Sequence, residues 1–152
     1  MKGAMIQMTK TSNDLYYTCS LIEYIGRKTK NPRYTVVDLL GEKYLKHILD
    51  HADVFHCEQI EEVADGFIEA CQIQTGDFDN VAACKYDVPS YWDIGAVYGR
   101  LIESLIKDEV VEKIIEVYHS WLAQYIDNYN IAVYYMTPQY LELSYEEGKL
   151  LD

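Results

Sequence analysis

The sequence predicts an all-α protein of about six amphipathic helices that pack as an irregular bundle. Apolar residues recur at the three- and four-residue spacing of helices along most of the chain. Residues 130–136 are strand-like but have no evident partner strand, and residues 81–84, which allow a short helix or a strand, are left as a loop. Hydrophobic residues make up 49% of the 152 residues and charged residues 25%, which is a globular composition.

A chain of this length forms one domain or two small sub-domains that share a core. We expect an N-terminal helical sub-domain over residues 10–75 and a C-terminal one over residues 86–152. The polar, glycine-containing stretch 74–80 is the best candidate for a linker between them.

The N-terminal half is expected to contain four helices. Ser12 offers a side chain that caps the first helix, and Pro32 disfavours a helical conformation of the residue before it, so this helix ends near Lys28. Gly41 is expected to stop the second helix. The predicted spans are 12–28, 35–41, 42–54 and 58–72.

The only basic cluster of the sequence lies where the first helix ends. It consists of Arg27, Lys28, Lys30 and Arg33. Cations near a helix C-terminus complement the helix dipole, which is the interpretation we adopt. A phosphate-binding role is the alternative that the same residues allow.

Residues 91–128 are predicted to form a central helical hairpin that acts as the scaffold. Ser90 can cap its first arm. Gly95 and Gly99 lie four residues apart beside the apolar stripe of this arm, which indicates that another helix backbone passes close by, within the chain or in a second subunit. The stripes comprise residues 94, 97, 98, 101, 102 and 105 in the first arm, and residues 110, 114, 117, 118, 121 and 125 in the second.

The pattern changes after the hairpin. Residues 130–136 are β-branched and aromatic, and the sequence leaves them open between a strand and a short helical turn. Thr137 and Pro138 form an N-cap and N1 pair. The final helix is therefore predicted from Pro138 to about Glu147, with Gly148 as its stop.

The net charge of −12 limits the partners that the protein can bind. Nucleic acids and anionic membranes are disfavoured because binding to them relies on an excess of lysine and arginine. An acidic surface favours solubility or a basic protein partner. No apolar run reaches the ~18 residues of a membrane span, and residues 1–8 are too short in their apolar part for a signal peptide. We therefore expect a cytoplasmic protein whose four cysteines are reduced.

Tyrosine is the most unusual feature of the composition, with 15 in the chain. Its apolar body and polar tip suit a surface that is buried against a partner and also tolerates water. Many tyrosines crowd the C-terminal third, interleaved with acids. We expect a partner-binding or homo-oligomeric face there. The alternative is that these tyrosines form the hydrated edge of the helical core. The predicted face consists of Tyr125, Tyr129, Tyr134, Tyr135 and Tyr140.

The alternative function is a metal-dependent enzyme that uses one helix face. His47, Asp50 and His51 are similar to the inverted zinc-protease signature His-x-x-Glu-His, with aspartate where that family has glutamate. The shorter aspartate would reach a zinc-bound water poorly. His56 and Cys57 follow nearby and could complete a ligand set. No catalytic nucleophile, phosphate loop or cofactor is predicted.

Part of the N-terminal half resembles a known family. The segments Cys-Ser-Leu-Ile-Glu-Tyr-Ile at 19–25 and Ala-Asp-Val-Phe-His at 52–56, continuing to Phe-Ile-Glu at 67–69, are similar to a family of small, uncharacterised bacterial helical proteins. Genes of that family tend to lie beside ADP-ribosyltransferase-like toxins. The resemblance therefore implies an antitoxin or accessory role, and it transfers no functional residue.

Taken together, these patterns favour a non-enzymatic protein-interaction module that acts as an antitoxin-like or regulatory partner and is homo-oligomeric. The metal-dependent enzyme is the first alternative. A small ligand bound between the two halves, near Trp92 and Arg100, is the second.

Overall fold

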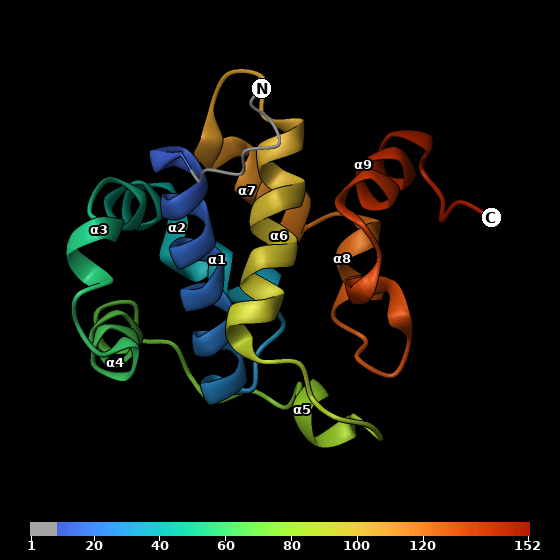
Figure 1. The fold of residues 1–152 in the computed structure, drawn as a ribbon. Coiled ribbons are helices and arrows are strands. Elements are labelled where there is room, and N and C mark those ends of the chain that lie inside the picture. The colour runs from blue at the N-terminus through green and yellow to red at the C-terminus, as the bar shows by residue number, and fades with distance from the viewer. Residues whose placement is uncertain (1–8) are drawn as a thin grey trace.

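The computed structural model describes residues 9–152, and every regular element in this range is a helix (Figure 1). The predicted all-α class is therefore confirmed. None of these helices is long and apolar enough to cross a membrane. The expectation about a signal peptide concerns residues 1–8, which lie outside the described range.

The helices are α1 (Lys10–Thr29), α2 (Arg33–Asp50), α3 (Ala52–Phe55), α4 (Ile60–Ala70), α5 (Asn80–Ala83), α6 (Tyr91–Leu105), α7 (Val110–Tyr118), α8 (Trp121–Ile126), the 3₁₀ helix η1 (Ala132–Tyr135) and α9 (Pro138–Glu147).

Helices α1 and α6 lie side by side at the centre of the molecule, with the other helices around them (Figure 1). Their backbones approach closely because glycine leaves room where they meet. A Cβ atom added at Gly95 would lie 2.7 Å from the Cα atom of Ser20, and one at Gly99 would lie 3.5 Å from the Cα atom of Tyr16. The prediction that a helix backbone passes these two glycines is confirmed, and that helix is α1 of the same chain.

Both predicted sub-domains contribute side chains to one hydrophobic core. On α6, residues 94, 98, 101, 102 and 105 of the predicted apolar stripe are buried, whereas Val97 is only partly buried and points away from α1. Fully buried members of the core come from both halves of the chain: Leu15, Ile22, Leu45, Ile94, Leu101, Ile114 and Ile126.

The chain leaves helical geometry at Gly41, as the sequence predicts. The chain has a positive φ of 73° at this residue, which is the conformation expected of a helix-stopping glycine. Helical geometry resumes directly after it, so the span labelled α2 consists of two helical stretches that meet at a kink at Gly41, and the expected stop at this glycine is confirmed. This helix ends at Asp50, and the following turn is the short α3.

The second arm of the predicted hairpin is broken into α7 and α8. Ser120 has an extended backbone (φ −76°, ψ 161°), and its hydroxyl donates a hydrogen bond to the Val117 carbonyl at 2.6 Å. Residues 132–135, which the sequence left open, form the 3₁₀ helix η1. The predicted last helix is confirmed: Thr137 caps α9 through the Tyr140 N–H, and Gly148 ends it with a φ of 81°.

Candidate partner-binding groove

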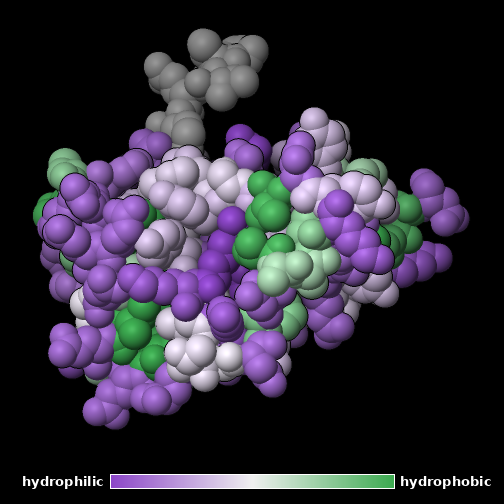
Figure 2. Space-filling model, turned by 90° about the horizontal axis from the view of Figure 1, so that it is seen from below, coloured by the Kyte–Doolittle hydropathy of each residue, from purple (hydrophilic) through white to green (hydrophobic). Residues whose placement is uncertain are grey.

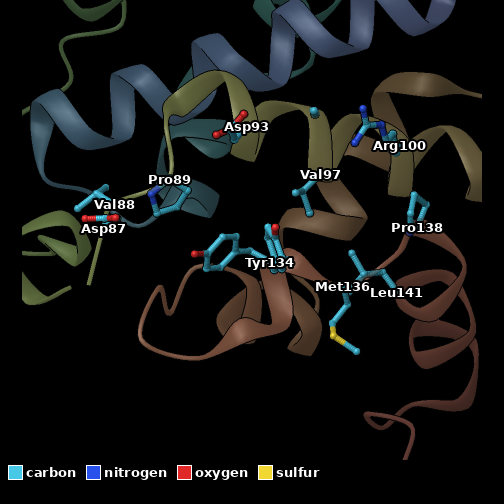
Figure 3. Close-up of a pocket in the computed structure, with 12 residues that line it drawn as sticks. Asp87, Val88, Pro89, Asp93, Val97, Arg100, Tyr134, Met136, Pro138 and Leu141 are labelled. Carbon is cyan, nitrogen blue, oxygen red and sulfur yellow. The ribbon is translucent and has the colours of Figure 1, made fainter. Parts of the chain in front are cut away.

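A groove of about 570 Å³ separates α6 from the C-terminal segment (Figure 3). One wall comes from α6 and the loop before it, and the other from η1 and the start of α9. In the close-up, Val97 and Tyr134 face each other across the groove, and Met136 and Leu141 close one end. The lining residues are Asp87, Val88, Pro89, Asp93, Ala96, Val97, Arg100, Tyr134, Tyr135, Met136, Pro138 and Leu141.

Helical spacing explains the α6 wall. Asp93, Ala96, Val97 and Arg100 are separated by three, four and seven residues, so they share one face of the helix. The residues between them form the face that is buried against α1. Helix α6 therefore packs one face in the core and lines the groove with another.

The opposite wall depends on a tight turn of the chain. Residues Ile131 and Met136 are extended on either side of η1, and Thr137 then begins α9. This geometry leaves the side chain of Tyr135 83% exposed and that of Met136 40% exposed. Seen from below, the surface is mainly hydrophilic, with hydrophobic side chains gathered in a few patches (Figure 2). Large, solvent-exposed apolar groups beside a groove are typical of a binding surface.

The charges of the groove are separated along its length. Asp87 and Asp93 lie toward one end and Arg100 toward the other (Figure 3). All three side chains are exposed, and none forms an ion pair with another residue in the range 9–152. Asp93 also lies in the first turn of α6, where the helix dipole stabilises a negative charge. These charges are therefore available to groups of a bound partner.

The structure divides the five tyrosines of the predicted face. Tyr134 and Tyr135 line the groove. Tyr125 is 42% exposed on α8, where its ring packs against Trp121, and it does not reach the groove. The Tyr140 hydroxyl donates a hydrogen bond to the Leu151 carbonyl at 2.8 Å and anchors the C-terminal residues on α9. Tyr129 is buried, with 3% of its surface exposed, so it belongs to the interior and not to the exposed face.

Tyr129 belongs to a buried group of charged and polar side chains, which we name the ionic cluster: Glu23, Arg27, Arg33, Asn80, Tyr98, Asp127 and Tyr129. At its centre Arg33 donates two hydrogen bonds of 3.0 Å to the Glu23 carboxylate. Arg27 donates a third at 2.7 Å, and the Tyr129 hydroxyl donates a fourth. Burial opposes the charge on Glu23, but Arg33 and Arg27 outweigh it and lower the pKa of Glu23 below its ordinary value.

This arrangement corrects the interpretation of the basic cluster at Arg33, whereas Arg27 and Lys28 lie in the last turn of α1 as expected. Arg33 is 1% exposed and passes over Gly26, where a Cβ atom would collide with its side chain. It therefore neither complements a helix dipole at the surface nor reaches a phosphate. The spacing of Glu23 and Arg27 by one helical turn is the one sequence signal for this cluster. Nothing in the local pattern indicates that Arg33 turns inward.

The second part of the ionic cluster holds Asp127. The Asn80 side chain accepts a hydrogen bond from Arg33 at 2.9 Å and donates one to the Asp127 carbonyl at 2.9 Å. The Tyr98 hydroxyl donates to the Asp127 carboxylate at 2.8 Å. Burial, together with the charge of Glu23, raises the pKa of Asp127 to about 7.

A row of aromatic contacts connects the groove to this cluster. The ring of Tyr134 packs edge-on against Tyr129 with centroids 5.9 Å apart, and Tyr135 packs edge-on against Tyr134 at 6.2 Å. Because Tyr129 is held by Glu23, this row of three rings fixes the position of the exposed wall. The groove is therefore preorganised by buried polar contacts.

The histidines of the alternative metal site are only partly brought together. The rings of His47 and His51 lie 4.5 Å apart, and His51 Nδ1 is 3.0 Å from the His47 carbonyl oxygen. His56 instead stacks on Trp92 at 5.6 Å, and Asp50 pairs with Lys46 at 3.1 Å. Within residues 9–152, no three histidine, cysteine, aspartate or glutamate side chains are arranged to hold a metal ion.

The other predicted ligand position is also divided between two environments. Trp92 packs on the N-terminal part of the protein, with its ring centroid 5.4 Å from that of Tyr16. Arg100 lines the groove. Comparisons with protein-family models, with curated proteins and with solved structures found no significant match. What the groove binds must therefore be inferred from its own residues.

Proposed function

We propose that the protein is an interaction module whose groove binds a short segment of another protein, one that carries basic residues beside apolar ones. The observation that carries this proposal is the exposed wall formed by Tyr135 and Met136 opposite Val97. Tyrosine and methionine are enriched at the cores of protein interfaces. The groove volume of about 570 Å³ accommodates a few side chains rather than a whole folded surface.

Charge favours a basic segment. Asp87 and Asp93 provide two carboxylates at one end of the groove, and the chain as a whole has a net charge of −12. A lysine or arginine of the partner would pair with these carboxylates, and the long-range field would speed its approach. Arg100, at the other end, offers donors to a carbonyl or carboxylate of the same segment.

A second copy of this chain suits the groove less well. Two copies would each carry the same charge of −12, and their mutual repulsion would oppose a contact through an acidic groove. Homo-oligomerisation thus stays a prediction of the sequence, separate from the groove. An antitoxin-like role is compatible with the proposed groove, provided that the toxin presents a basic and apolar segment to it.

The test is a selection of binding peptides from a random displayed library against the purified protein. We expect enriched peptides to combine lysine or arginine with aromatic or aliphatic residues. Tyr135→Ala should weaken their binding about tenfold or more, because a buried interface tyrosine contributes about 2 kcal/mol. Asp93→Asn should weaken the cationic peptides selectively and make their binding less dependent on salt.

Tyr125→Ala is the matched control, since Tyr125 is also an exposed C-terminal tyrosine but lies outside the groove. Its binding of the selected peptides should equal that of the natural protein. Peptides without a cationic preference, or equal binding by Tyr135→Ala and Tyr125→Ala, would contradict the proposal.

A further inference from the structure

A second hollow, of about 500 Å³, lies between the start of α2 and the corner where α7 meets α8. It is separate from the groove and shares no lining residue with it. The aromatic residues Tyr34, Phe78 and Tyr118 are among those that line it. A volume of this size is sufficient for a small organic ligand.

The most informative lining residue is Asp127, a carboxylate that is only 9% exposed. Its position is fixed, because Tyr98 donates to one carboxylate oxygen at 2.8 Å and Asn80 donates to its backbone carbonyl at 2.9 Å. No other described residue donates a hydrogen bond to the carboxylate. An anchored, largely buried carboxylate therefore borders the hollow with one oxygen that has no protein donor.

The nearby arginines do not satisfy that oxygen. Arg33 donates its hydrogen bonds to Glu23, to Asn80 and to the Asn31 carbonyl. Arg27 donates its own to Glu23, to the Pro89 carbonyl and to Tyr129. Buried carboxylates are ordinarily hydrogen-bonded or paired with a cation. A positively charged donor in the hollow would supply the missing partner.

The walls suit a cation with an apolar body. Ring faces of tyrosine and phenylalanine attract ammonium groups and also cover hydrocarbon. The guanidinium of Arg33 already lies over the Phe78 ring, 5.8 Å from its centroid, so Phe78 serves as apolar wall and Tyr34 as the ring open to a cation. Gln124 contributes a side-chain amide to the lining. His119, at the rim, has its Nε2 atom 2.7 Å from Asp38, so any positive charge on this imidazole is offset by a carboxylate.

We propose that this hollow is a binding site for a small organic ammonium ion, whose charged nitrogen pairs with Asp127 and whose apolar part lies between Tyr34 and Phe78. The pKa of Asp127 is raised first by burial and then by Glu23, and Arg33 and Arg27 offset this only in part, which fits a carboxylate that forms no ion pair with another described residue. The ammonium group is shared by free amines and by lysine side chains, so the two sources need separate probes.

The test is a titration of the ¹⁵N-labelled protein, followed by NMR, with phenethylamine, with the neutral isostere 2-phenylethanol and with N-acetyl-lysine amide. Phenethylamine should give saturable shifts at residues 118–127 and at the Gln124 side-chain amide. The neutral isostere should bind about tenfold or more weakly, because it lacks the charge-assisted hydrogen bond. If N-acetyl-lysine amide binds more tightly than phenethylamine, the natural ligand is a protein lysine; the reverse order identifies a free amine.

Two variants keep the test informative. Asp127→Asn preserves the size of the side chain and can still accept from Tyr98, and it should lose about tenfold or more in affinity for phenethylamine. Tyr34→Ala removes one wall of the hollow without touching the ionic cluster and should weaken binding severalfold. Tyr125→Ala, similarly exposed but outside the hollow, should bind as the natural protein does. Absence of saturable shifts, or equal affinity for amine and alcohol, would overturn the proposal.

Discussion

Tyr129 and Tyr135 lie six residues apart, yet one is 3% exposed and the other 83% exposed. The Tyr129 hydroxyl donates a hydrogen bond to Glu23 inside the ionic cluster, whereas Tyr135 forms part of the outer wall of the groove. Between them, Asn130 and Ile131 lead the chain from the core to the surface through the turn of η1. The same residue type thus serves folding in one region and is available for binding in the other, and the tertiary contact decides which.

Substitutions in the ionic cluster should lower the stability of the fold strongly, whereas substitutions in the groove should hardly change it. The cluster consists of side chains that satisfy one another in the interior, so removal of one leaves its partner buried without compensation. The groove carries the exposed side chains of Asp87, Asp93, Arg100 and Tyr135, whose removal leaves no buried partner unsatisfied. The predictions that follow test this contrast, from the largest expected effect to the smallest.

Replacement of Arg33 should have the largest effect. Arg33→Met leaves Arg27 as the one cation beside the buried Glu23, and we expect the free energy of unfolding to fall by about 3–5 kcal/mol. Arg100→Met in the groove is the matched control and should change stability by less than about 0.5 kcal/mol. Urea unfolding followed by circular dichroism measures both. Equal losses for the two variants would remove the distinction between cluster and groove.

The pH dependence of stability should identify Asp127. The pKa of its carboxyl is 3.8 in an ordinary setting and about 7 in the folded protein. In this interval the folded state retains the proton that the unfolded state releases, so its contribution to the free energy of unfolding falls as pH rises from 3.8 to about 7, by a few kcal/mol in all. Glu23 acts oppositely: its pKa is lowered, so its contribution is lost only at more acidic pH.

Asp127→Asn should remove this decline, because asparagine carries no titrating proton in either state. The relevant quantity is the difference between the two proteins in urea unfolding across the pH series, which cancels the other titrating groups. The groups that act on Asp127 are Glu23, Arg33, Tyr98 and Arg27. A constant difference at every pH between 4 and 7 would show that Asp127 ionises normally.

The two glycines of α6 should differ in their tolerance of alanine. Gly95→Ala places a methyl group 2.7 Å from the Ser20 backbone, so α1 and α6 must separate, at a cost of about 1–3 kcal/mol. At Gly99 the nearest atoms are 3.5 Å away, an ordinary contact, and alanine is the better helix former by about 1 kcal/mol. Gly99→Ala should therefore leave thermal stability unchanged or raise it. The reverse order would contradict the close approach of α1 and α6 at Ser20.

Local patterns in the sequence were sufficient for the helical class and for several element ends. Thr137 and Gly148 bound α9 as expected because capping depends on a few adjacent residues. The spacing of Gly95 and Gly99 correctly indicated a close helix, although only the structure identifies it as α1. Gly41 likewise separates two helical stretches as expected, although the second of them ends at Asp50 rather than near Val54.

The functional features depended on contacts between distant segments. Glu23 and Arg33 are ten residues apart and meet only because the chain turns at Asn31 and Pro32. The stripe of Asp93, Val97 and Arg100 could be read from helical spacing, but its opposite wall comes from residues 134–141. Among the predicted tyrosines, composition could not separate Tyr129, which is satisfied in the interior, from Tyr135, which is exposed. Burial of a polar group is a tertiary property.

The most direct test of the proposed function is photo-crosslinking from the groove in the protein's own host. A photoreactive phenylalanine analogue would replace Tyr135, and in a second protein it would replace Leu39, which is 44% exposed on α2 and lies outside the groove. The proposal predicts a crosslink from position 135, absent from position 39, to a segment that carries lysine or arginine beside apolar residues, and its loss in Asp87→Asn/Asp93→Asn. No crosslink at position 135, or crosslinking to an acidic segment, would contradict it.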